Sequence, residues 1–170
     1  MITNSILEAI YTRRSIRAFT DQDVDDELIK EIIRAASYAP SGLNNQPWRF
    51  IVIRDASLKK EISSLTHYSK IVEGANALIA VLLDNEVVYN RDKDLQAIGA
   101  SIQNLLLAIH SLDLGAVWLG EILNKKDKFH KMLSLEGKYE LMAVVAIGYK
   151  AKDDATSSRK GIDELIIKEL

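Results

Sequence analysis

Three arginines near the N-terminus surround one serine and could bind a small anion. Arg13, Arg14 and Arg17 place three guanidinium groups within five residues, beside the hydroxyl of Ser15. A phosphate monoester fits this set, because an arginine fork matches two phosphate oxygens and a hydroxyl can hold a third. Cations also favour a helix C-terminus through the macrodipole, so a stabilised helix end is the alternative interpretation.

A second group of hydrogen-bonding side chains lies in the loop at residues 39–48, Ala-Pro-Ser-Gly-Leu-Asn-Asn-Gln-Pro-Trp. The loop holds both prolines of the chain, Pro40 and Pro47. Its uncharged side chains that donate and accept hydrogen bonds are Ser41, Asn44, Asn45 and Gln46. Such a loop can bind the edge of a polar, planar, uncharged ring. Because Pro, Gly and Asn form turns in any protein, an ordinary helix-to-strand connection is the alternative.

The composition excludes several kinds of site. The chain has no Cys, so disulfides, thiolate nucleophiles and Cys-ligated metals are ruled out. The histidines, His67, His110 and His130, show no metal-ligand spacing. No Gly-x-Gly-x-x-Gly or Walker-type loop occurs, so a bound nicotinamide would not use a Rossmann domain. An enzyme with neither nucleophile nor metal usually depends on a cofactor for its chemistry.

Length and charge indicate one soluble globular domain spanning residues 1–170. The sequence is 48% hydrophobic and 27% charged, which is typical of such a domain. The net charge of −2 gives no basic field for nucleic acid. No apolar run reaches about 18 residues and no basic-then-apolar leader is present, so we expect no membrane partner and a cytoplasmic location.

Apolar periodicity predicts the elements that position these residues. The predicted helices run from a capping box at Ser5 to about Arg13, from Asp23 or Asp25 to Ala39, from Ser57 to about Leu65, from Asp94 to Leu112, and from Asn124 to about Leu133. Gly115 is the predicted C-cap after the long helix. The predicted strands are 49–53, 76–83, 116–119 and 141–147, with a further strand from the tail. We therefore expect an α+β fold with a central mixed, mostly antiparallel sheet.

The long helix is apolar or small almost all round. Such a helix must be covered on nearly every side, so residues 94–112 predict either the centre of the domain or a subunit interface.

Two sequence boxes, in order, resemble the signature of the nitroreductase family, the FMN-dependent NAD(P)H oxidoreductases. The first is the Arg-x-Ser-x-Arg-x-Phe box at residues 13–19, and the second is the Pro-Ser-x-x-Asn-x-Gln-Pro-Trp loop at residues 40–48. Softer similarity extends over residues 4–165. The resemblance implies a three-layer α/β/α sandwich, and a homodimer with FMN at the subunit interface.

The resemblance also implies roles for particular residues. Arg13, Arg17 and Arg159 would hold the FMN phosphate with Arg14 and Ser15, and Lys160 is the alternative to Arg159 because both form one basic pair. Pro40, Ser41, Asn44 and Gln46, from the partner subunit, would border the isoalloxazine ring. The backbone at Leu119 and Gly120 would cover the flavin N5, since a glycine permits close approach. A simple turn at Gly120 and a solvated basic pair on the tail are the alternatives.

The activity implied is hydride transfer from NAD(P)H to the flavin and then to a nitroaromatic, a quinone or a similar acceptor, in a ping-pong cycle. No residue is assigned as a catalytic acid or base. The connection at residues 84–93 leaves little room for the helical insertion common in relatives, so we expect an open substrate pocket. A flavin-binding protein without turnover is the main alternative, and a helical interaction module that binds acidic partners is another.

Overall fold

The fold is built on a four-stranded sheet. The computed structural model describes residues 4–135 and 137–170. Its strands are β1 (Trp48–Ile53), β2 (Ala77–Asp84), β3 (Leu114–Leu119) and β4 (Tyr139–Tyr149), in the order β1-β2-β4-β3. β2 and β4 lie in the centre, which explains why their sequences are almost continuously apolar.

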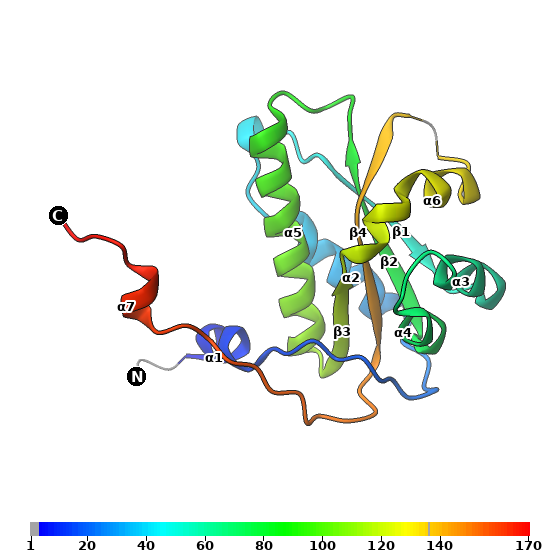
Figure 1. Cartoon of the computed structure of the whole chain (residues 1–170), viewed down its shortest axis with the longest axis horizontal. Helices are drawn as coiled ribbons and strands as arrows, with labels where there is room; N and C mark the ends of the chain where they lie inside the picture. Colours follow the sequence, from blue (N-terminus) through cyan, green and yellow to red (C-terminus); the bar gives the residue numbers. More distant parts are fainter. Residues whose placement is uncertain (1–3, 136) are drawn as a thin grey trace.

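Helices cover both faces of this sheet, so the three-layer α+β fold is confirmed (Figure 1). One face packs against α2 (Asp26–Ser37) and α5 (Arg91–Ser111). The other packs against α3 (Ala56–Ser63), α4 (Ser69–Gly74) and α6 (Lys126–Met132). The remaining helical segments are α1 (Ser5–Thr12), the short 3₁₀ turns η1 (Gly42–Asn44) and η2 (Glu121–Lys125), and α7 (Ile162–Leu165).

The sheet differs from the prediction in two respects. All three strand pairings are antiparallel in the described residues, so the expected mixed character is wrong for this chain. No strand forms in residues 151–170, where α7 is the only regular element. The tail has no neighbouring strand edge of its own chain to pair with, because it leaves the body after an isolated bridge between Phe19 and Lys150.

Two helix caps differ from the prediction. Asn4, not Ser5, caps α1, and its Oδ1 accepts from the Leu7 amide at 2.9 Å. Asp55, not Ser57, caps α3 in the same way. In both cases the side chain of a polar residue one or two positions earlier accepts the hydrogen bond from the first turn.

Three further boundaries were also wrong. α5 begins at Arg91 rather than Asp94, because Asn90 caps it by accepting from Lys93. Gly115 is not a C-cap but lies within β3, and the left-handed residue after the helix is Asp113, with φ of 58°. Asn124 does not cap α6; it lies inside η2.

α5 organises the chemistry-bearing segments along its length. The loop containing η1 lies against its N-terminal half, and α1 lies against its C-terminal end (Figure 1). The segment that follows α1 then runs along β3, where the Ile16 amide donates to the Ala116 carbonyl at 2.9 Å. Among the described residues, no helix has both the length and the apolar character that crossing a membrane requires.

Candidate functional site

The predicted arginine cluster does assemble in three dimensions. Arg13, Arg14, Ser15 and Arg17 line a hollow of about 210 Å³. The opposite wall comes from the C-terminal tail and consists of Ala155, Thr156, Ser157 and Arg159. Lys160 is not one of the lining residues, so the geometry favours Arg159 for the basic pair.

The cluster carries positive charge that the described residues do not neutralise. None of its four guanidinium groups lies within 4.0 Å of a carboxylate in the part of the chain that the structure describes. Their protein hydrogen bonds go to backbone carbonyls, such as Arg14 to Tyr11 at 2.6 Å and Arg159 to Ser158 at 2.7 Å. Burial, and then the charges of Arg159 and Arg14, lower the pKa of Arg13. An anion bound in this hollow would relieve that repulsion.

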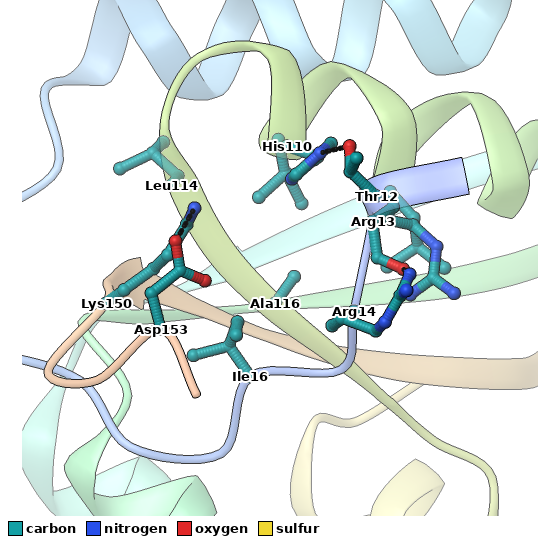
Figure 2. A pocket seen from close by; sticks show the side chains of 11 residues that line it. Thr12, Arg13, Arg14, Ile16, His110, Leu114, Ala116, Lys150 and Asp153 are labelled. Atoms are coloured by element: carbon teal, nitrogen blue, oxygen red, sulfur yellow. Dashed lines mark hydrogen bonds and ion pairs between the residues drawn. The ribbon is translucent and has the colours of Figure 1, made fainter. Parts of the chain in front are cut away.

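A hydrogen bond behind the cluster joins α1 to the end of α5. The Thr12 hydroxyl donates to the Glu8 carbonyl at 2.7 Å, so it accepts from His110 Nε2 at 2.8 Å (Figure 2). Burial, followed by the charges of Lys150 and Arg13, lowers the pKa of His110. The neutral imidazole therefore anchors the residue before Arg13 without adding to the positive charge of the cluster.

The amide-rich loop is held in an unusual backbone conformation. Leu43, Asn44 and Gln46 have φ values of 55°, 54° and 46°, in the left-handed region that few non-glycine residues adopt. Ser41 Oγ accepts from the Gln46 amide at 3.0 Å and closes the turn. Leu43 is 85% exposed. Such conformations persist only where surrounding contacts enforce them, and they are common at ligand-binding sites.

A buried carboxylate supplies those contacts. Asp94 is fully buried in α5 and accepts from Asn45 Nδ2 at 2.7 Å and from the amides of Tyr89 and Asn90 at 3.1 Å. Asn45 Nδ2 also donates to the Val87 carbonyl at 3.0 Å. The sequence showed no sign of this tie, because its partners are 49 residues apart.

The loop also borders a hollow of about 340 Å³. Pro40, Ser41 and Gly42 form one side of it. The other side comes from Tyr89 and α5, through Lys93, Gln96, Ala97 and Ala100. Asn44 and Gln46 are exposed on the same loop, so the predicted hydrogen-bonding side chains reach solvent.

The end of β3 presents open backbone. Leu119 is buried in the core, so only its main chain is available to a ligand. Gly120 is exposed and has a φ of −81°, which does not itself require glycine. A Cβ built there meets only Trp118 Nε1, at 4.0 Å, so the glycine leaves free space above the chain. Trp118 is 43% exposed beside it.

The structure brings some of these parts together and keeps others apart. The cluster lies beside the first residues of β3, where Ile16 bonds to Ala116. Gly120 lies about 13 Å from Ala116 along the strand direction, at 3.3 Å per residue. The loop contacts α5 at Ala97, whereas the wall behind the cluster contains Ile109. These positions are about 18 Å apart along the helix axis at 1.5 Å per residue. The loop and the cluster therefore line separate hollows of the chain.

Comparison with known proteins identifies the family. The sequence profile of the nitroreductase family matches residues 10–81 and 63–149. A protein of Archaeoglobus fulgidus, provisionally named an NADH dehydrogenase/NAD(P)H nitroreductase, is 38% identical over 147 residues, which are 84% of each chain. An FMN reductase of Bacillus subtilis is 27% identical over 92% of this chain and 70% of its own length.

A solved structure is similar over the whole fold. It is that of a provisionally assigned nitroreductase of Desulfovibrio desulfuricans in complex with FMN, which is 46% identical with a TM-score of 0.95 over 99% of both chains. The two sequence boxes and the antiparallel sheet fit these matches. The chain therefore belongs to the nitroreductase family.

Proposed function

We propose that this protein is an FMN-dependent oxidoreductase that takes hydride from NAD(P)H and passes electrons to a nitroaromatic, a quinone or a similar acceptor in a ping-pong cycle. The carrying observation is the hollow in which four guanidinium groups, none paired with a carboxylate in the residues that the structure describes, meet the hydroxyl of Ser15. It suits the phosphate of FMN in charge and in donor geometry. Two relatives named for FMN, the reductase and the cofactor complex, support this choice.

Different residues would bind different parts of FMN. Arg13, Arg17 and Arg159 would hold the phosphate, helped by Arg14 and Ser15. The open main chain at Leu119 and Gly120 lies further along β3, where a backbone amide could donate to the flavin N5. The bound flavin would supply the redox chemistry by carrying hydride at N5. The protein would supply orientation and electrostatics.

The second half of the site would come from another copy of the chain. The loop with Ser41, Asn44 and Gln46 lies toward the opposite end of α5 from the cluster of its own chain. Two copies packed with their α5 helices antiparallel would bring each loop to the other's cluster. Exposed apolar side chains on α1 and the tail favour such a dimer: Ile6, Ile10, Tyr11, Ile162, Leu165 and Ile167. Sedimentation equilibrium should give twice the chain mass of 19.0 kDa, and a monomer that still binds FMN tightly would contradict the shared site.

The visible spectrum of the purified protein tests the cofactor and the activity. After addition of FMN and gel filtration, we expect a retained flavin band that bleaches anaerobically with NADH or NADPH and returns with an acceptor. A band that stays oxidised would identify a flavin binder without nicotinamide-driven turnover. No retained band would overturn the proposed function.

A further inference from the structure

Next to Gly120 stands a carboxylate that is held in place by hydrogen bonds. Glu121 Oε2 accepts from the Thr66 hydroxyl at 2.6 Å and from the His67 amide at 3.2 Å. These bonds fasten the connection between α3 and α4, residues 64–68, to the first residue of η2, just after β3. The hydrogen bond from Thr66, and then those from the backbone and the charges nearby, lower the pKa of Glu121, so the carboxylate is ionised at neutral pH.

The same carboxylate faces an imidazole that is open to solvent. Glu121 Oε1 lies 3.8 Å from His67 Nε2, and the His67 side chain is 92% exposed. The other charge that acts on Glu121 is that of Lys125, in the η2 turn. The His67 ring lies with its Nε2 toward Glu121. The other two imidazoles have structural partners: His110 bonds to Thr12, and His130 Nε2 accepts from the Leu141 amide.

We propose that His67, oriented by Glu121, is the proton donor to the bound electron acceptor. The inference rests on the proposed function, because it requires a reduced flavin beside Gly120. Reduction of a quinone to a hydroquinone needs two electrons and two protons. A bound, reduced flavin would supply a hydride, which carries both electrons and one proton. His67 supplies the second proton: in the doubly protonated ring the Nδ1–H bond breaks, an O–H bond forms on the acceptor oxygen, and solvent reprotonates the neutral ring, whose Nε2 faces Glu121.

This assignment gives Glu121 a positioning role and His67 a catalytic one. The hydride transfer from NAD(P)H to the flavin needs no such proton, so the two half-reactions should separate. We expect His67→Ala to slow anaerobic reoxidation by benzoquinone about tenfold, a modest general-acid effect because solvent can partly replace an exposed donor. Flavin reduction by NAD(P)H should change less than twofold. Added imidazole should restore reoxidation, and Glu121→Gln should slow the same step.

A measurement that does not depend on turnover locates His67. Diethyl pyrocarbonate should modify His67 rapidly in the oxidised, FMN-loaded protein, as peptide mass spectrometry would show. A non-reducible aromatic, 4-hydroxybenzoate, should slow that modification severalfold, while His130 serves as the internal reference. Glu61→Gln, an exposed carboxylate of α3, is the matched control for Glu121→Gln and should leave both half-reactions unchanged.

The results discriminate between the two proposals. A protein that retains no FMN overturns the proposed function and this inference with it. Retained FMN with equal losses in both half-reactions, with no loss, or with no rescue by imidazole overturns the inference alone. Unprotected His67 does the same, because a proton donor must lie beside the acceptor.

Discussion

Replacement of Arg13 and Arg17 by alanine should remove most of the affinity for FMN and leave the fold intact. Both guanidinium groups border the hollow of about 210 Å³, and neither lies within 4.0 Å of a carboxylate in the described residues. A hydrogen bond to a charged group contributes about 1.5–3 kcal/mol. The loss of two should therefore weaken FMN binding by about 3–6 kcal/mol, or roughly 10²- to 10⁴-fold in Kd.

Stability should respond much less than binding. Arg17 is exposed, and removal of Arg13 relieves its repulsion with Arg159 and Arg14. We expect the free energy of unfolding of the flavin-free protein to change by less than about 1 kcal/mol, as is usual for surface positions. Urea unfolding followed by circular dichroism would measure it.

The assay is a fluorescence titration with FMN and with riboflavin, which lacks the phosphate. The wild-type protein should prefer FMN strongly, and the double variant should bind both flavins with similar Kd values. Lys30→Ala with Arg34→Ala, on the exposed side of α2, removes the same charge and should keep the preference. If the double variant still prefers FMN as strongly as the wild type, the phosphate is not bound in this hollow.

Three other changes test the framework of the site. Glu140→Gln should lower the free energy of unfolding by about 1 kcal/mol at neutral pH, because Arg91 holds the pKa of Glu140 below its usual 4.5. A lowered carboxyl pKa stabilises the fold above pH 4.5. The difference between variant and wild type in urea unfolding should therefore vanish as the pH falls through the folded-state pKa. Asp94→Ala should cost about 3 kcal/mol in the same assay, since it leaves buried donors unpaired, and a change below 1 kcal/mol would show that water replaces the carboxylate. Gly115→Ala would place a Cβ 2.7 Å from Ile16 Cγ2, so the free energies of unfolding and of FMN binding should both fall by about 1–3 kcal/mol. An unchanged affinity for FMN would show that this contact does not position the arginine cluster.

Local sequence determined which segments form helices and strands. β2 was predictable because its eight residues are all buried, and a strand in the centre of a sheet needs apolar side chains on both faces. β4 and α5 were predictable for similar reasons. Helix ends were less predictable, because neighbouring polar residues such as Asn4 and Ser5 can both act as caps, and the choice depends on where the chain turns.

The candidate site was only partly predictable from sequence. Arg13, Ser15 and Arg17 lie close in sequence, so the geometry of a short segment ensures their proximity. Arg159 joins them only because the segment after α1 pairs with the end of β4, which also starts the tail. The sequence spacing cannot show that Arg159 meets the cluster, because about 140 residues separate them and the folding of those residues determines the contact.

Tertiary structure alone decided how the two chemical segments relate. The sequence marked residues 39–48 as a binding loop, yet its strained backbone depends on the buried Asp94 of α5, which no local pattern reveals. The same packing holds the loop and the arginine cluster at different ends of α5. A hydrogen-bonding sequence can therefore specify what a segment binds, whereas only the packed helix determines whether one chain can complete the site.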